Sequence, residues 1–288
     1  MRILVTGSDG LLGEALRRVL TQRHDVIWTD REDLDVRDLG SVRACVQAER
    51  PAAIIHLAAI TQVDACERSP ESAFEVNALG TRYVALAARE IEARLLFVST
   101  DYVFDGALGR AYREYDTPAP LNVYGWSKLH GERAVEALVP RHFIVRTSGL
   151  FGAGRPCFPE AILRAVTRDG CAHVVDDQVC RPTYAGDLAA AAATIIAGEE
   201  YGRYHVASAG ETSWFAFAQA VLEQAGSLRA DVLRPVASAD LKRAARRPAH
   251  SVLDTRAYEW TFGQALPHWS EGLARFWDER TAEPAHGG

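Results

Sequence analysis

Cysteine is scarce in this chain, and its placement argues against the usual structural uses of the residue. Five cysteines occur in 288 residues, an odd number, and no two form a Cys-x-x-Cys pair. The histidines do not fall at zinc-ligand intervals either. The sequence therefore predicts reduced thiols, no disulfide framework and no metal site.

Clusters of positive charge and long apolar runs are also missing. The formal net charge is -6, and the basic run at 243–247 is too short for a nucleic-acid duplex, so we expect no nucleic-acid partner. No apolar stretch approaches the roughly 20 residues of a membrane span, which predicts no membrane association. The chain starts directly with a predicted strand and shows no signal-peptide pattern, so we expect a cytoplasmic protein.

A glycine-rich turn stands at the start of the sequence, between a predicted strand and a predicted helix. The strand covers 2–6, and the turn follows within 7–13 as GSDGLLG. Such a turn lets the backbone approach a pyrophosphate, held at the positive end of the helix, and lets the helix pack closely on the strand. A plain structural turn is the alternative. The predicted cofactor-binding residues here are Gly7, Asp9, Gly10, Leu11, Leu12 and Gly13.

Two residues after the second predicted strand bear on which dinucleotide binds. Asp30 and Arg31 directly follow the strand at 25–29. A carboxylate at this place binds the ribose 2′-hydroxyl of NAD, whereas an arginine accepts the 2′-phosphate of NADP. Because Arg31 can fork onto that phosphate, we expect NADPH as the cofactor, with NADH tolerated.

Further cofactor contacts are expected near the next strands. Asp35 and Val36 are placed to meet the adenine edge, while Asp38 is a candidate helix cap. The predicted strand at 53–57 runs into small residues that let a cofactor lie across the strand ends. The contacts predicted there are Leu57, Ala58 and Ala59. We expect His56 to be a hydrogen-bonded core histidine rather than a catalyst.

Thr100, Tyr124 and Lys128 supply a hydroxyl, a phenol and an ammonium in the order that carbonyl reduction needs. Tyr124 and Lys128 are four residues apart and so share one face of a helix. A nearby lysine cation favours the phenolate and lowers the tyrosine pKa toward the working pH. An amphipathic helix with one aromatic residue and one surface lysine is the alternative. We predict these three as catalytic residues, with the tyrosine and the lysine also contacting the cofactor.

Motifs in the expected order along nearly the whole chain resemble the extended short-chain dehydrogenase/reductases, and within them the dTDP-4-dehydrorhamnose reductase family. The first half contributes the glycine spacing, HLAA at 56–59, STDYVFDG at 99–106 and the Tyr124–Lys128 pair. The second half contributes RTS at 146–148, DQ at 177–178, RPT at 181–183, GETSW at 210–214 and RPAHSVLDT at 247–255.

This resemblance implies a role for each matched residue. Tyr124 would protonate the oxygen of a 4-keto sugar while hydride arrives from the nicotinamide. Lys128 would bind the nicotinamide ribose, and Thr100 would complete the hydrogen bonds of the carbonyl. Arg181 and Arg247, in the C-terminal part, would help to hold the diphosphate and base. The substrate-binding residues implied in this way are Asp101, Tyr102, Gly149, Gln178, Arg181 and Arg247.

Two departures from relatives bear on the reaction and the substrate. Dehydratases of the superfamily place an Asp-Glu pair after the catalytic threonine, whereas Asp101 is followed here by Tyr102, which favours reduction over elimination. Some family members carry tryptophan where this chain has Gly149. An aromatic surface for the sugar would then come from elsewhere, and Phe151 is one candidate.

Predicted strands and helices alternate up to about residue 150, which indicates a doubly wound parallel sheet with helices on both faces, a Rossmann fold. We expect an NAD(P)-binding domain at 1–150, a smaller α/β substrate-binding lobe at 151–280 and a mobile tail at 281–288. Ligands bind where parallel strands end. The residues at these predicted ends are Thr6, Asp30, Ala58, Thr100 and Thr147.

The sequence thus predicts NAD(P)H-dependent reduction of a nucleotide-linked 4-keto-6-deoxy sugar, with dTDP as the nucleotide. Three alternatives remain: a sugar-nucleotide epimerase, an NADP-binding regulatory subunit of the methionine adenosyltransferase beta type, and a reductase of a non-sugar carbonyl. Metal-linked dimers of the family use glutamates where this chain has Ala15 and Gly186, which again predicts no metal. We expect a monomer or a homodimer.

Overall fold

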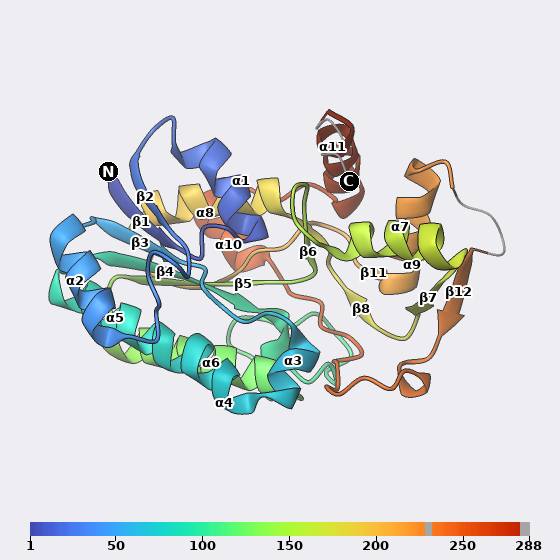
Figure 1. The fold of residues 1–288 in the computed structure, drawn as a ribbon, viewed down its shortest axis with the longest axis horizontal. Coiled ribbons are helices and arrows are strands. Elements are labelled where there is room, and N and C mark those ends of the chain that lie inside the picture. Colours follow the sequence, from blue (N-terminus) through green and yellow to red (C-terminus); the bar gives the residue numbers. More distant parts are fainter. Residues whose placement is uncertain (228–231, 283–288) are drawn as a thin grey trace.

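Six parallel strands form the central sheet of the protein (Figure 1). The computed structural model describes residues 1–227 and 232–282. Every neighbouring pair of strands runs parallel, as the doubly wound fold requires. The strands in sheet order are β10 (Gly202–His205), β5 (His142–Thr147), β4 (Arg94–Thr100), β3 (Ala53–His56), β1 (Arg2–Thr6) and β2 (Asp25–Thr29).

Helices cover both faces of this sheet because its strands are apolar on both sides. Along β1, Ile3 and Val5 point to one face and Leu4 to the other, and all three are fully buried. The first face is covered by α1 (Leu11–Leu20), α8 (Ala185–Ala197) and α10 (Arg256–Phe262). The second is covered by α2 (Leu39–Glu49), α5 (Thr81–Glu90) and α6 (Val123–Leu138). The predicted fold class is confirmed.

Short helical segments shape the region where the strands end. They are α3 (Val63–Arg68), α4 (Pro70–Phe74), the π-helix η1 (Glu75–Gly80), and the 3₁₀ turns η2 (Asp101–Val103) and η3 (Ser238–Asp240). The first three connect β3 to α5, and η2 directly follows β4. These four segments therefore bring side chains to the carboxyl ends of the central strands, whereas η3 lies later in the chain.

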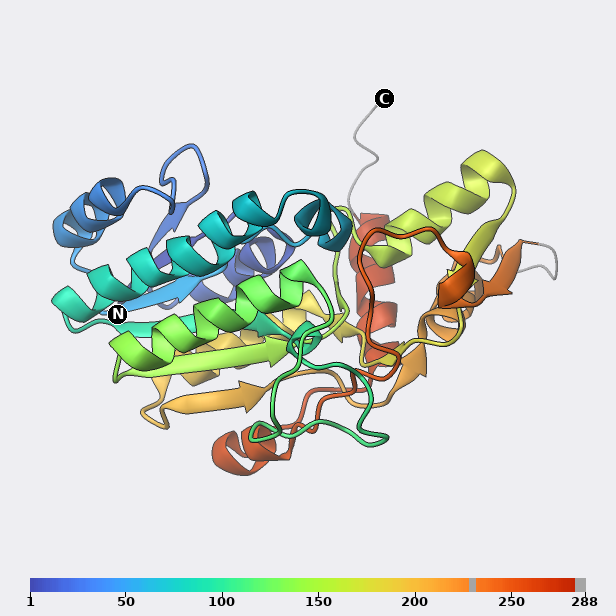
Figure 2. The same cartoon turned by 90° about the horizontal axis from the view of Figure 1, so that it is seen from below.

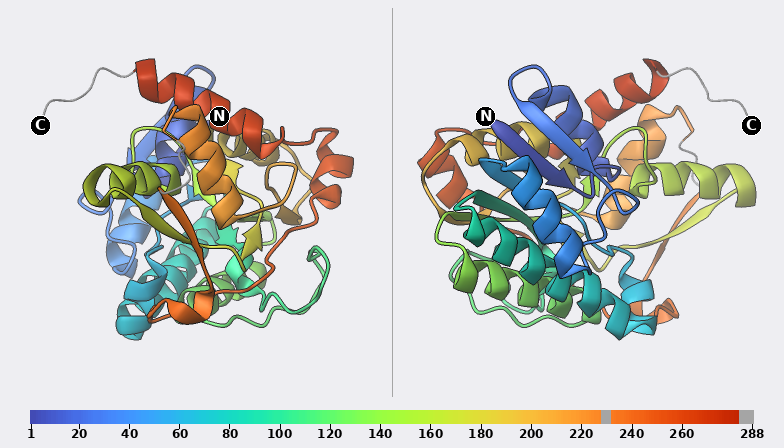
Figure 3. Two further views of the ribbon diagram at one scale, coloured as in Figure 1. Left: turned by 90° about the vertical axis from the view of Figure 1, so that its right-hand side faces the viewer. Right: turned by 60° about the vertical axis from the view of Figure 1, so that its left-hand side comes forward.

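A second lobe lies beside the sheet and is built from three short strand pairs and three helices (Figures 2 and 3). The pairs are β6 (Leu150–Phe151) with β9 (Thr183–Tyr184), β7 (Ala172–Val175) with β12 (Leu233–Val236), and β8 (Val179–Cys180) with β11 (Thr212–Ser213). The helices are α7 (Phe158–Asp169), α9 (Trp214–Gln224) and α11 (Trp269–Ala282). Aromatic side chains fill its core, with Phe151 and Phe217 fully buried.

The chain does not divide at residue 150 as simply as predicted. After that residue it enters the second lobe, then returns to supply α8 and the edge strand β10 to the large sheet. A pattern of alternating elements shows which segments are strands, but not to which sheet each strand belongs. In the predicted tail, residues 281 and 282 complete α11, and the rest lies outside the described residues. None of the helices in the described parts has the length and apolar character needed to cross a membrane.

Candidate functional site

The glycine turn after β1 is tightly packed between the sheet and α1. Gly7 has φ +69°, and a Cβ there would stand 2.6 Å from the backbone nitrogen of Ala58. A Cβ on Gly13 would stand 2.1 Å from the carbonyl oxygen of Ser8. Gly10 caps α1 without a side chain, so the first N–H groups of the helix lack an intrahelical acceptor. This cradle fits a pyrophosphate group, which those N–H groups can bind.

Asp30 and Arg31 lie in different environments directly after β2. The carboxylate of Asp30 accepts hydrogen bonds from its own loop, at 2.7 Å from the backbone nitrogen of Glu32, and these bonds lower its pKa. Arg31 is exposed and makes no ion pair within the described residues. Its guanidinium is therefore available to an anionic group at this edge of the sheet.

The other predicted cofactor contacts lie around the end of β3 and the loop before α2. Arg37 forks onto the carboxylate of Asp35, while the buried Val36 packs against Gly80. Leu57, Ala58 and Ala59 are partly exposed where β3 ends. Separately, two predictions are confirmed. Asp38 caps α2, and His56 is a core histidine with hydrogen bonds to Thr6 and Thr81.

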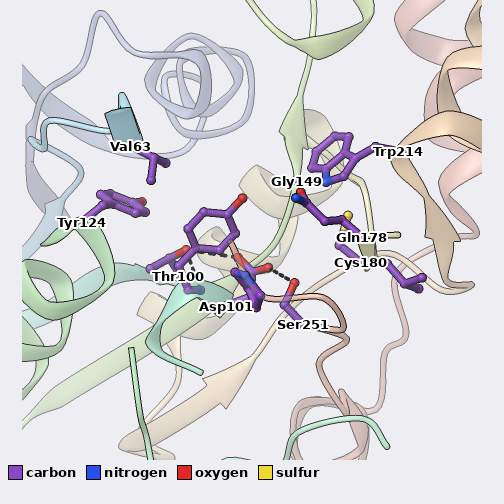
Figure 4. Close-up of a pocket in the computed structure, with 12 residues that line it drawn as sticks. Val63, Thr100, Asp101, Tyr124, Gly149, Gln178, Cys180, Trp214 and Ser251 are labelled. Carbon is purple, nitrogen blue, oxygen red and sulfur yellow. Dashed lines mark hydrogen bonds between the residues drawn. The ribbon is translucent and has the colours of Figure 1, made fainter. Parts of the chain in front are cut away.

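A pocket opens where β4 and β5 end, between the sheet and the second lobe (Figure 4). Its lining residues are Val63, Thr100, Asp101, Tyr102, Tyr124, Gly149, Gln178, Val179, Cys180, Trp214, Pro248 and Ser251. The larger part of the molecule supplies the residues up to Tyr124, and the second lobe and the loop after it supply those from Gln178 on. The pocket is therefore formed by both parts of the molecule together.

Tyr124 and Lys128 share one face of α6, where Lys128 is buried and Tyr124 is half-buried. Burial raises the pKa of the Tyr124 phenol, although the Thr100 side chain acts in the opposite direction. Burial also lowers the pKa of Lys128 to about 7, and its ammonium lies 4.0 Å from the centre of the Phe97 ring. The sequence-based expectation that the lysine lowers the tyrosine pKa is not met, because desolvation of the phenol dominates here.

Asp101 is the centre of a buried hydrogen-bond cluster beside these residues. Its Oδ1 accepts from the Thr100 hydroxyl at 3.1 Å. Its Oδ2 accepts from the hydroxyls of Ser148 at 3.0 Å and Ser251 at 2.6 Å. Burial raises the pKa of the Asp101 carboxyl to about 6, while the three hydroxyls act against that rise. The cluster ties β4, the end of β5 and the loop after η3 together.

The implied substrate-binding residues fall into two groups. Asp101, Tyr102, Gly149 and Gln178 line the pocket, and the Gln178 amide donates to Ser238 at 2.6 Å. Arg181 and Arg247 do not line it. Arg181 is half-buried and donates to the Thr255 hydroxyl at 3.2 Å. The Arg247 guanidinium forks onto Asp64 of α3, at 2.7 and 2.8 Å.

Asn77 is a positioning residue that sequence analysis missed. It lies fully buried in the π-helix η1, accepts from the backbone nitrogen of Ile60 at 2.8 Å and donates to the Ser127 hydroxyl at 2.9 Å. Ser127 in turn donates to the carbonyl oxygen of Tyr124 at 2.8 Å. The signal in the sequence is a single asparagine among the apolar residues Val76, Ala78 and Leu79.

Sequence analysis assigned no role to five other pocket residues, namely Val63, Val179, Trp214, Pro248 and Ser251. The last three lie in the GETSW and RPAHSVLDT motifs, which were the signal that could have found them. Phe151, the aromatic residue suggested as a surface for the sugar, is fully buried in the core of the second lobe and does not line the pocket. The aromatic side chain next to Gly149 is that of Trp214.

Comparisons with known proteins agree with this architecture. Residues 1–282 match the family described as the RmlD substrate binding domain. A dTDP-4-dehydrorhamnose reductase of Streptomyces griseus is 41% identical over 279 residues, covering 94% of this chain and 91% of that protein. The crystal structure of dTDP-4-dehydrorhamnose reductase from Bacillus anthracis in complex with NADP superimposes with a TM-score of 0.93 at 37% identity, covering 96% and 99% of the two chains.

A more distant structure shares the fold alone. The UDP-glucose 4-epimerase of Thermus thermophilus has a TM-score of 0.84 but only 23% identity, covering 99% of this chain and 100% of that one. The match over residues 1–282 and the 41% identity over nearly the full length are far more specific. The chain therefore belongs to the dTDP-4-dehydrorhamnose reductase family.

Proposed function

We propose that the protein reduces the keto group of a dTDP-linked 4-keto-6-deoxy sugar with NADPH as the reductant. The observation that carries this proposal is the meeting of Thr100 and Tyr124 in one pocket, with Lys128 one turn further along α6. These groups can bind and protonate a carbonyl oxygen. The names of the relatives, dTDP-4-dehydrorhamnose reductases, support the choice of substrate.

The glycine turn and the residues at the strand ends would hold the dinucleotide. Gly7, Gly10 and Gly13 leave room for the pyrophosphate at the start of α1, and Arg31 would take the 2′-phosphate. When bound, NADPH would supply the hydride for the carbonyl carbon. The NADP in the related structure supports this preference, and NADH would be tolerated because Asp30 stands beside Arg31.

The protein's own residues would donate the proton and orient the sugar. Tyr124 would give its phenolic proton to the carbonyl oxygen, and Thr100 would donate a second hydrogen bond to the same atom. In the free protein Thr100 donates its one hydroxyl proton to Asp101, and it would exchange this bond for the one to the carbonyl oxygen when the substrate binds. The Lys128 ammonium would stabilise the phenolate that remains after proton transfer, which offsets the cost of forming it in a buried place.

Remote parts of the substrate would supply much of the binding energy. Arg247 and Arg181 are proposed to hold the diphosphate and base, and the Asp64 carboxylate fixes the direction of the Arg247 guanidinium. Binding energy from the nucleotide can then orient the sugar carbonyl for reaction. In this proposal the second lobe is the substrate-binding lobe. The monomeric or homodimeric state and the cytoplasmic location stay predictions.

The test is an assay with NADPH and an enzymatically generated dTDP-4-keto-6-deoxy sugar, following loss of the absorbance of reduced nicotinamide. We expect one reduced sugar nucleotide for each NADPH consumed. A changed sugar configuration without net oxidation of the cofactor would indicate an epimerase. Tight cofactor binding without turnover of the sugar would overturn the proposal and favour a regulatory subunit or a non-sugar carbonyl substrate.

A further inference from the structure

The indole of Trp214 forms the wall of the pocket beside Gly149, at the end away from Tyr124 (Figure 4). Trp214 is the first residue of α9, and Ser213 caps this helix by accepting from the Ala216 N–H at 3.1 Å. The Trp214 backbone N–H donates to the carbonyl oxygen of Gln178 at 3.2 Å. These two hydrogen bonds fix the backbone at Trp214, from which the indole extends.

Aromatic rings support the indole from the core of the lobe. The Phe158 ring lies 4.6 Å from it, centroid to centroid, and the Phe217 ring lies 6.3 Å away. Trp214 is only half-buried, because the part that lines the pocket is open. Within the described residues no side chain or backbone group accepts a hydrogen bond from its Nε1–H. A rigid apolar surface therefore faces the pocket.

Because residue 149 is glycine, the indole of Trp214 can occupy the space beside it. Gly149 has φ +54°, and a Cβ built on it would stand 3.1 Å from Pro182 Cα and 3.4 Å from the edge of the Trp214 ring. A larger residue at 149 would be strained and would have to displace the indole to enter the pocket.

Among the described residues that line the pocket, those beside the indole carry no charged side chain. Its neighbours in the lining are Gly149, Val179 and Cys180, and burial raises the pKa of the Cys180 thiol, which therefore stays neutral. Arg247 is paired with Asp64 on α3, next to Val63. Arg181 follows Cys180 but does not line the pocket, and its guanidinium donates to Thr255. An uncharged aromatic wall suits the C–H face of a deoxysugar and not a diphosphate.

We propose that Trp214 is a specificity-determining residue whose indole stacks on the sugar ring of the substrate. This inference rests on the proposed function, because it assumes that a nucleotide-linked deoxysugar enters the pocket. With the carbonyl at Tyr124 and the diphosphate toward Arg247, the ring face that remains meets the indole.

The test compares dTDP with dTDP-rhamnose, which differ by the sugar alone. Binding of each is measured by calorimetry to the full chain saturated with NADP⁺, for the wild type, Trp214→Leu and Trp214→Phe. We expect Trp214→Leu to weaken dTDP-rhamnose about tenfold, as a lost aromatic contact of this size would. Trp214→Phe should weaken the binding of dTDP-rhamnose less than Trp214→Leu does. Both variants should bind dTDP within about twofold of the wild type. Trp277→Leu is the matched control, because Trp277 is also half-buried in this lobe but does not line the pocket.

Several results would overturn the inference. Equal weakening of dTDP and dTDP-rhamnose would mean that Trp214 acts on the nucleotide or only on folding. The same selective loss in Trp277→Leu would assign the effect to the packing of the lobe. Unchanged binding of dTDP-rhamnose in both Trp214 variants would also refute it. If the wild type binds neither dTDP nor dTDP-rhamnose, the proposed function itself fails, and this inference with it.

Discussion

Two half-buried tyrosines line the same pocket, and only one of them is proposed to give up a proton. The rings of Tyr102 and Tyr124 lie edge to face, 6.1 Å apart. We expect Tyr124→Phe to lower kcat by a factor of about 10²–10⁴, the usual contribution of a general acid, with cofactor binding nearly unchanged. Tyr102→Phe is the matched variant and should keep kcat within about tenfold. If steady-state kinetics showed the large loss of kcat in Tyr102→Phe and not in Tyr124→Phe, the assignment of Tyr124 as the acid would be wrong.

The buried ammonium of Lys128 makes stability depend on pH. Its pKa is lowered to about 7 in the folded protein from 10.5 when exposed. Between these values the unfolded chain binds one more proton than the folded one, so the free energy of unfolding should rise with pH from about 7 to 10. The slope from this group is at most about 1.4 kcal/mol per pH unit. Urea unfolding at several pH values measures it.

Lys128→Met should remove that rise, because methionine fills a similar volume and does not titrate. Lys242→Met is the control, since Lys242 is exposed. A wild-type slope that survives in Lys128→Met would show that another group is responsible.

Arg31 is the residue on which the choice between the two cofactors depends. It is exposed and makes no ion pair within residues 1–227 and 232–282, so its removal should disturb little else. We expect Arg31→Ala to weaken NADPH at least tenfold while changing NADH by less than about threefold, because only NADPH carries the 2′-phosphate. Equal losses for both cofactors, in fluorescence titrations, would rule out recognition of the phosphate by this side chain.

The residues that could be predicted from the sequence are those whose partners are close along the chain. Asp38 caps the helix that begins at the next residue, and Tyr124 and Lys128 share a helix face by their spacing alone. Ser251 could not be predicted, because it reaches Asp101 across 150 positions. Trp214 lies in the GETSW motif, but its position beside Gly149 could not be predicted, since it depends on how the β8–β11 pair folds back.

At the scale of the elements, a buried ion pair fixes α6 against the sheet. Glu132 accepts from Arg146 of β5 at 2.6 and 2.8 Å and from Ser99 of β4 at 2.6 Å, with both charged side chains fully buried. Removing one partner of such a pair leaves an uncompensated buried charge. We therefore expect Glu132→Ala to lower the free energy of unfolding by about 3–5 kcal/mol in urea denaturation.

A second glutamate on the same helix provides the control. Glu136 lies one turn further along α6 and pairs with Arg203, and both side chains are partly exposed. Glu136→Ala should lower the free energy of unfolding by no more than about 1 kcal/mol, because an exposed ion pair usually contributes no more than that. If the two variants lost equal stability, the buried pair would not be what holds α6 in place.

The regular elements followed from the sequence better than the irregular ones. The apolar strands and amphipathic helices are set by local sequence pattern, as in β1 and α7. The π-helix at Glu75–Gly80 has no such periodicity signal, although its extra residue per turn directs Asn77 toward Ser127. The two-residue strands of the second lobe are too short to produce a pattern at all.

At the scale of the whole molecule, the large sheet is completed by α8 and β10, which follow the first strands and helix of the second lobe in the chain. Helix α8 packs on α1 through the small and apolar residues Leu188, Ala189 and Ala192, which meet Leu16 and Leu20 in one core cluster. The alanines allow the two helices to approach closely. Residues 1–150 by themselves would expose this face of the sheet and leave β5 as an unpaired edge.

We therefore expect the fragment 1–150 not to fold cooperatively, although it contains the whole predicted cofactor site. The apolar area that α8 and β10 cover is lost from the fragment, while the entropy cost of ordering its own residues is unchanged. Near-ultraviolet circular dichroism and urea unfolding of the fragment, with the full chain as the reference, measure this. A sharp, two-state transition of the fragment would mean that the first 150 residues form an independent domain and that α8 serves mainly to attach the second lobe. Without such a transition, the cofactor-binding and substrate-binding parts fold as one unit, because the chain crosses between them more than once.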